Sequence, residues 1–159
     1  MRNGNMAIEK VKEYFKQFHR ENDILEFEVS SATVELAAKA LNCEEALIAK
    51  TLSFLVGEQP ILIVTAGNMK IDNSKYKKTF HKKAKMIPFN DVEKIIGHET
   101  GGVCPFGIND GIDVYLDESL KQYEYVYPAC GSSNSAIKLN IKELEEYSNY
   151  KEWVDVCKC

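Results

Sequence analysis

The stretch 97–107 holds residue types that could bind a reacting group through the main chain. Its sequence is Gly-His-Glu-Thr-Gly-Gly-Val-Cys-Pro-Phe-Gly. So many glycines beside a proline exclude a regular helix or strand and predict a shaped loop. Because glycine lets a backbone approach a ligand closely, the N–H groups at Gly101 and Gly102 could point into a pocket with an apolar wall. Amides in this arrangement suit an oxyanion or a phosphate, although a tight turn with two hydrophobic anchors would show the same composition.

Two other segments carry polar groups where predicted strands begin or end. Lys50 stands at the entrance of a strand predicted over residues 50–56, and its side chain could either serve chemistry or simply extend from the strand end into solvent. A second small, polar turn begins with Gly131 and Ser132, directly after a strand predicted over 125–130. The main-chain amides of this turn could act together with those of the loop 97–107.

Composition limits the class of protein and its partners. The 159 residues, 45% of them hydrophobic, predict one domain with a real core. Lys and Arg total 20 against 24 Asp and Glu, so the net charge of -4 excludes a global basic field for nucleic acid. The local exception is the stretch 69–85, where seven lysines and His81 face only Asp72. This stretch is the one candidate surface for a polyanion, or else a solvated helix face.

Cysteine usage indicates the compartment. The five cysteines are an odd number, and they are accompanied by neither a secretory signal nor a long apolar span. The sequence therefore predicts a protein of the reducing cytoplasm that does not enter a membrane.

The elements that position these groups follow from periodicity and capping signals. Apolar spacing predicts helices from residue 6 to about 19 and over 34–41, and a strand over 23–29. The strand 50–56 is joined by a turn to residues 61–66, which are so continuously apolar that they should form a central strand buried on both faces. Asp72 or Asn73 should then begin a helix through Phe80.

The second half alternates short strands with capped helices. Asn90 and Glu93 predict a capping box for a helix that ends at Gly97, and Asn140 and Glu143 repeat the pattern. Strands are predicted over 84–88, 112–116, 125–130, 136–139 and 153–156. The predicted class is α+β: one domain with a mixed, barrel-like sheet flanked by helices, with residues 1–22 as an N-terminal helix and 23–159 as the core.

Several segments, taken in order, resemble the YbaK/prolyl-tRNA-synthetase-associated domain family of freestanding or appended aminoacyl-tRNA deacylases. The resemblance runs from about Thr33 to the C-terminus. Its segments are Ala49-Lys50-Thr51-Leu52, Gly101-Gly102-Val103-Cys104-Pro105-Phe106-Gly107, Val114-Tyr115-Leu116-Asp117-Glu118-Ser119-Leu120, and Gly131-Ser132 ahead of Ile137-Lys138-Leu139.

This resemblance implies hydrolysis of the ester of a misacylated tRNA, commonly tRNA for proline carrying a small amino acid, without a metal or cofactor. The partners implied are the acceptor end of that tRNA and a prolyl-tRNA synthetase that delivers it. The implied catalytic residues are Lys50, Gly101, Gly102, Gly131 and Ser132. The implied substrate-binding residues are Thr33, Thr51, Val103, Pro105 and Phe106, of which the last three could size the aminoacyl pocket.

Chemistry of this kind needs no strong nucleophile, because the ester is already labile. Lys50 could hold the adenosine end of the tRNA, bind the substrate carbonyl or stabilise the developing oxyanion. If it is partly desolvated, its pKa falls and base chemistry becomes conceivable. Two rival functions stay open: a hydrolase that uses Cys104 or Cys130 as nucleophile with His81 or His98 as base, and a module that binds an aminoacyl-tRNA or an amino acid without turnover.

Overall fold

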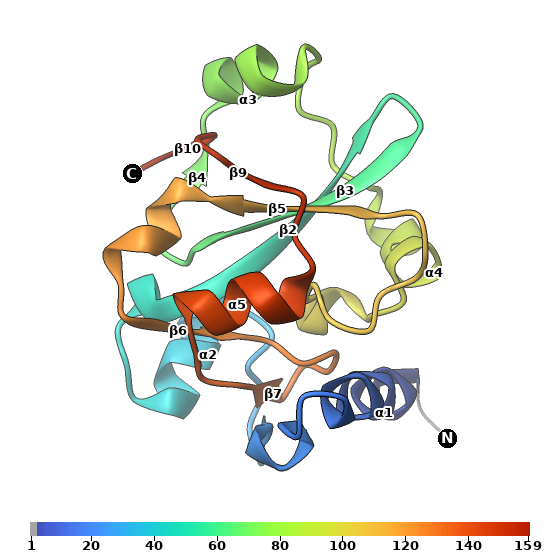
Figure 1. Cartoon of the computed structure of the whole chain (residues 1–159), viewed down its shortest axis with the longest axis vertical. Coiled ribbons are helices and arrows are strands. Elements are labelled where there is room, and N and C mark those ends of the chain that lie inside the picture. Colours follow the sequence, from blue (N-terminus) through green and yellow to red (C-terminus); the bar gives the residue numbers. More distant parts are fainter. Residues whose placement is uncertain (1–2) are drawn as a thin grey trace.

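The computed structural model describes the backbone of residues 3–159 and the side chains of residues 7–159. A curled, mixed six-stranded sheet in the order β8-β6-β2-β3-β5-β9 forms its centre, and two-stranded pairs β1-β7 and β4-β10 lie beside it (Figure 1). The predicted α+β class with a barrel-like mixed sheet is confirmed. The strands are β1 (Leu25–Glu26), β2 (Ile48–Val56), β3 (Gln59–Ala66), β4 (Lys70–Ile71), β5 (Asp113–Asp117), β6 (Tyr125–Pro128), β7 (Ser135–Ala136), β8 (Leu139–Asn140), β9 (Glu152–Val154) and β10 (Cys157–Lys158).

The helices lie around the sheet, and α3 is set apart from the others. In Figure 1, α3 stands at one end of the long axis, while α1 and α2 lie toward the other. The helices are α1 (Asn3–Lys16), α2 (Val34–Leu41), α3 (Asn73–Phe80), α4 (Val92–Ile96) and α5 (Ile141–Ser148). Among residues 3–159, no helix has both the length and the apolar character needed to cross a bilayer.

The β2–β3 hairpin is the middle of the sheet, as its apolar sequence predicts. Alternate residues of β3 enter different cores, because side chains of a strand point to opposite faces. Leu62 and Val64 join the core that contains Phe15 of α1, whereas Ile61 and Ile63 join the core around Tyr76 of α3. The hairpin is thereby fixed from both sides and forms a rigid base for residues at its edges.

Local capping signals account for most helix ends. Thr33 caps α2 by accepting a hydrogen bond from the N–H of Leu36, and the helix ends at its predicted position. Asn140 forms the predicted capping box of α5 with Glu143. The box predicted at Asn90 is wrong: a 3-10 turn over Phe89–Asp91 follows Pro88, so Asn90 lies inside a turn and cannot cap α4.

Several predicted strands are shorter in the structure. The strand expected over 23–29 is only β1, and that over 136–139 is divided into β7 and β8. The stretch 84–88 makes only one bridge, between Met86 and Phe54 of β2. This shortening matters because it leaves part of β2 without a neighbour.

Candidate functional site

The central strand β2 has a gap along one edge. β3 pairs with its other edge from Ala49 to Val56, whereas β6 pairs in parallel only with Ile48 and Ala49. Further along, the N–H of Ile87 donates to the carbonyl of Ser53, and the N–H of Leu55 donates to the carbonyl of Lys85. Residues 50–52 therefore face no strand on this side, and we call them the open edge of β2.

Thr51 presents its backbone at the open edge. Backbone groups of a strand alternate in direction, and the carbonyl of Ser53 and the N–H of Leu55 both point to this edge. The N–H and C=O of Thr51 must point the same way. No backbone partner for them is found in the described part of the chain.

A cavity of about 220 Å³ opens along this edge. It lies between β2, the start of α2, the segment around β6 and β7, and the first half of the loop 97–107. Its lining residues are Ser31, Ala32, Thr33, Val34, Ala37, Ile48, Ala49, Lys50, Thr51, Leu52, Thr100, Gly101, Val103, Tyr127, Ala129, Ser135 and Ala136. The structure thus brings together five of the sequence-predicted site residues: Thr33, Lys50, Thr51, Gly101 and Val103.

Two hydroxyls of the cavity wall are buried without a hydrogen-bond partner. They are the Oγ of Ser31 and the Oγ1 of Thr51, and among residues 7–159 only four buried side-chain polar atoms are in this state. A buried polar group without a partner is costly, so such atoms are rare in folded proteins. Two of them in one cavity indicate a place where a polar ligand completes the hydrogen bonding.

Lys50 lies opposite Thr65 in the hairpin and is half-buried at the cavity. Its amine donates a hydrogen bond to the carbonyl oxygen of Met69. Burial lowers the pKa of the Lys50 amine, while nearby Cys157 and Glu45 raise it. The amine is held by a neutral carbonyl, and no ion pair to it occurs in residues 7–159, so its charge is available to a ligand.

The first glycine turn forms the cavity wall opposite β2. Thr100–Gly102 is a 3-10 turn in which the N–H of Gly102 donates to the carbonyl of Glu99 at 2.9 Å. The first two amides of such a turn, Thr100 and Gly101, have no partner inside it. A Cβ added at Gly101 would lie 2.9 Å from the Cβ of Ala32, so only glycine lets this turn approach the cavity so closely.

The second glycine turn, at Gly131 and Ser132, contacts the first turn and does not line the cavity. The N–H of Gly131 donates to the carbonyl of Gly102 at 3.0 Å and is therefore not free for a ligand. The hydroxyl of Ser132 is bonded to Asn134 and Ser135. Neither Gly131 nor Ser132 lines the cavity, so the expectation that amides of both turns face one pocket is not met at Gly131.

The next residues of the loop, Cys104, Pro105 and Phe106, are buried. Phe106 is fully buried and its ring lies 4.8 Å from that of Phe15, which places it away from the cavity that it was expected to size. Pro105 lines a different hollow, beside Tyr14 and Ile108. Of the three expected sizing residues, only Val103 reaches the cavity.

A buried cysteine and histidine occur in this loop. The Sγ of Cys104 lies 3.4 Å from the Nε2 of His98, which in turn is 2.7 Å from the carbonyl oxygen of Phe106. Both side chains are fully buried. Burial raises the pKa of Cys104 to about 12 and lowers the pKa of His98 to about 4. This pair is neutral and closed to solvent, whereas a thiolate nucleophile needs a lowered pKa and access.

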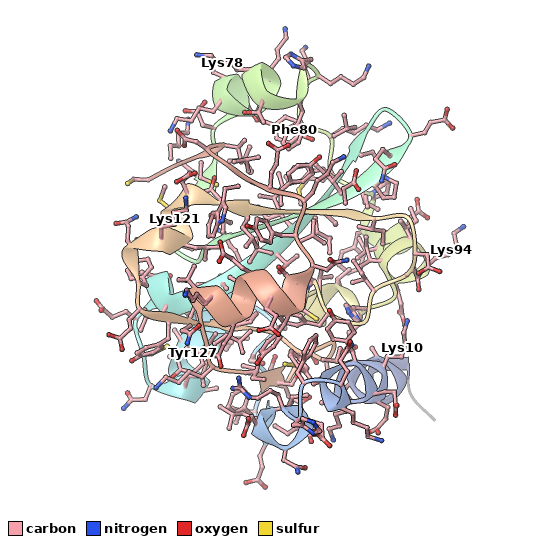
Figure 2. All side chains as sticks on the ribbon, in the orientation of Figure 1. Lys10, Lys78, Phe80, Lys94, Lys121 and Tyr127 are labelled. Atoms are coloured by element: carbon pink, nitrogen blue, oxygen red, sulfur yellow. The ribbon has the colours of Figure 1, made fainter. Side chains whose placement is uncertain are left out.

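The lysine-rich stretch 69–85 is mostly remote from the cavity. Figure 2 shows Lys78 of α3 at one end of the molecule and Tyr127, a cavity residue, toward the other. Lys75 is engaged with Asp155 and with the carbonyl of Cys157. The stretch reaches β2 at its two ends: the carbonyl of Met69 accepts from Lys50, and the carbonyl of Lys85 accepts from the N–H of Leu55.

Sequence reasoning did not identify Ser31 or Tyr127 as cavity residues. Ser31 stands in a run of small polar residues that resembles an ordinary helix start, and nothing in the sequence separates the buried serine from its exposed neighbour Ser30. Tyr127 reaches the cavity only because β6 pairs in parallel with β2. Such a long-range register has no local signal.

Comparisons with known proteins show the family to which this chain belongs. The family model of the aminoacyl-tRNA editing domain matches residues 28–147. The chain therefore belongs to the aminoacyl-tRNA editing domain family, and its resemblance to YbaK-type domains is confirmed. It is similar to the uncharacterized protein YwhH of Bacillus subtilis (strain 168), with 54% identity over 154 residues that cover 96% of this chain and 98% of that protein.

Solved structures have the same fold. One, described provisionally as a trans-editing enzyme for prolyl tRNA synthetase, has a TM-score of 0.85 at 24% identity and covers 96% of this chain and 98% of that one. Another, the hypothetical protein APE2540, has a TM-score of 0.82 at 26% identity over 94% of this chain and 99% of that one.

Proposed function

We propose that the protein hydrolyses the ester bond of misacylated tRNA, acting in trans on tRNA for proline that carries a small amino acid. The observation that carries the proposal is one cavity lined by Lys50, Thr100 and Gly101 together with Ser31 and Thr51, whose hydroxyls have no partner. Membership of an editing-domain family supports it. The acceptor end of the tRNA is the proposed ligand, with prolyl-tRNA synthetase as the proposed source of the substrate.

The chemistry proposed for the cavity is hydrolysis of a labile ester: water adds to the carbonyl carbon, the bond from that carbon to the ribose oxygen then breaks, and a proton from the water passes to the leaving ribose oxygen. Negative charge then gathers on the carbonyl oxygen, and the amides of Thr100 and Gly101 together with the ammonium of Lys50 stabilise it. To reach the substrate, the Lys50 amine either breaks its hydrogen bond to the Met69 carbonyl or donates another of its protons to the substrate. The hydroxyls of Ser31 and Thr51 and the open backbone of Thr51 hold the aminoacyl group, and Val103 limits its size.

Gly102, Gly131 and Ser132 act in this proposal as positioning residues. The second turn fixes the first through the bond between Gly131 and Gly102, and the N–H of Ser133 donates to the carboxylate of Glu99 just before the first turn. Preorganised amides are effective because they need no reorganisation during the reaction.

The surroundings of Cys104 and Cys130 do not favour the alternative in which a thiol is the nucleophile. Cys130 is fully buried, and burial raises its pKa well above the usual value. Cys104 has the raised pKa described above, and neither thiol lines the cavity. Alkylation of the exposed Cys159 should leave ester hydrolysis intact. Loss of hydrolysis in a Cys104→Ala or Cys130→Ala protein that keeps its fold would return this alternative to consideration.

The binding-module alternative is separated from an enzyme by turnover. The test incubates the protein with tRNA for proline charged with alanine, cysteine or serine and follows loss of the ester. We expect multiple turnovers, and we expect Lys50→Met to reduce the rate by about 10²–10³-fold, the usual effect of removing one oxyanion-stabilising group. Lys142→Met, at an exposed position of α5, is the matched control. Tight binding without turnover across a full panel of charged tRNAs would favour a module.

A further inference from the structure

A second, larger hollow adjoins the cavity at the open edge of β2. Its volume is about 560 Å³. Four residues belong to both spaces: Thr51, Leu52, Thr100 and Val103. The remaining lining residues are Ser53, Met86, Ile87, Pro88, Phe89 and Val92. We call this space the Phe89 hollow.

The Phe89 hollow exposes an aromatic ring that the fold does not require at the surface. Phe89 is 74% exposed and Met86 is 55% exposed, whereas most large apolar side chains of the described residues are buried. The ring is not on a loose loop. Pro88 begins the 3-10 turn that carries it, and Ile87 is bonded to Ser53 of β2. Phe89 is therefore held in place while its ring faces solvent.

A positive segment leads into the same hollow. Lys82, Lys83 and Lys85 precede Met86, and all three are exposed. In residues 7–159 none of them forms an ion pair. An exposed aromatic ring suits a nucleotide base, which can stack on it, and the unpaired cations of the segment that precedes Met86 suit the phosphates of the same ligand.

We infer that the Phe89 hollow binds the terminal adenine of the acceptor end by stacking on Phe89, while the aminoacyl group occupies the neighbouring cavity. This inference rests on the proposed function. The ribose, which joins base and ester, lies over the residues common to both spaces. The arrangement gives the protein a contact that is the same for every tRNA, because every acceptor end finishes with adenosine. Choice of amino acid then rests with the cavity alone.

The test measures binding of 5′-AMP through backbone amide resonances of the full-length protein. We expect saturable shifts at Met86, Ile87 and Phe89. Phe89→Ala should weaken binding at least about fivefold, which is the lower end for loss of one base stack, and Phe89→Trp should retain it. Leu25→Ala is the matched control, because Leu25 is an exposed apolar residue (42%) that lines neither space.

Two results would overturn the inference: equal AMP affinity of wild type and Phe89→Ala, or a concentration-dependent dimer that Phe89→Ala abolishes. Deacylation of charged tRNA separates the two levels. If wild type cleaves and Phe89→Ala cleaves equally well at limiting substrate, the adenine site fails while the proposed function stands. If AMP binds at Phe89 but no charged tRNA is cleaved, the adenine site stands and the proposed function fails.

Discussion

The two glycine turns have similar composition but different surroundings. Thr100–Gly102 borders the cavity and its first two amides have no partner within the turn. The turn at Gly131 and Ser132 is buried, and the N–H of Gly131 and the hydroxyl of Ser132 are bonded inside the protein. Glycine in both marks a close approach of backbones. Only the first approach leaves space for a ligand, so composition alone does not separate a binding turn from a supporting one.

The largest effect should come from the contact between the turns. A Cβ at Gly102 would lie 2.4 Å from the backbone N of Ser132 and 2.6 Å from the carbonyl carbon of Gly131. Main chain cannot yield as a side chain does, so Gly102→Ala should lower the free energy of unfolding by more than about 4 kcal/mol. Chemical denaturation measures this loss. A stable Gly102→Ala protein would mean that the turns do not support each other.

The buried His98, which precedes the first turn in the loop 97–107, should make the fold sensitive to acid. The pKa of His98 is about 4 in the folded protein against 6.5 for an ordinary histidine, because burial disfavours its charged form. Its stabilising contribution is complete above pH 6.5 and is lost as the pH falls, which amounts to about 3 kcal/mol by pH 4.

Unfolding curves from pH 7 to 4 for wild type and His98→Gln measure this contribution. The stability difference between the two should shrink as the pH falls. His81→Asn is the control, because His81 is exposed and has the left-handed backbone that Asn tolerates. A difference independent of pH would contradict the role given to His98.

Gly101→Ala should sharpen the contrast with Gly102→Ala. Its added Cβ would lie 2.9 Å from the Cβ of Ala32, 3.1 Å from the Cβ of Ser133 and 3.4 Å from the Cα of Ala32, so each contact is longer than those at Gly102. We expect a stability loss of about 1–2 kcal/mol, smaller than at Gly102 but accompanied by a reduced rate of deacylation. Denaturation and single-turnover assays on the same preparations provide both values. Full activity in Gly101→Ala would remove this turn from the site.

The smallest effects should distinguish free from bonded hydroxyls. Thr51→Val removes a buried hydroxyl without a partner, so stability should stay the same or rise by up to about 1 kcal/mol while deacylation slows. Ser132→Ala removes a bonded hydroxyl and should cost about 1 kcal/mol. Thermal unfolding of both variants measures whether the two changes in stability differ in sign as expected. A clear loss of stability in Thr51→Val would show that its hydroxyl already has a partner.

Local signals in the sequence were sufficient for much of the fold. The continuous apolar run of β3, the helix over 34–41 and the box at Asn140 each depend on neighbouring residues, and the structure confirms these three predictions. The box at Asn90 failed because Pro88 begins a 3-10 turn earlier in the chain. Strand lengths failed where pairing depends on distant segments, as at 84–88.

The candidate site was harder to predict, because burial decides it. Lys50, Thr51 and Gly101 line the cavity, but nothing local shows that Phe106 turns into the core or that the amide of Gly131 is already used. Ser31 was missed for the same reason. Roles assigned to these residues remain predictions that the variants above test.

The short gap in β2 also bears on how the protein avoids self-association. Unpaired strand edges invite another chain to add a strand, which is a common route to aggregation. Here the gap spans only residues 50–52 and ends against β6 on one side and the Lys85–Ile87 contacts on the other. An incoming peptide cannot run along it, whereas a compact group can enter. Unpaired backbone N–H and C=O groups can therefore lie in the middle of the sheet without allowing another chain to add a strand there.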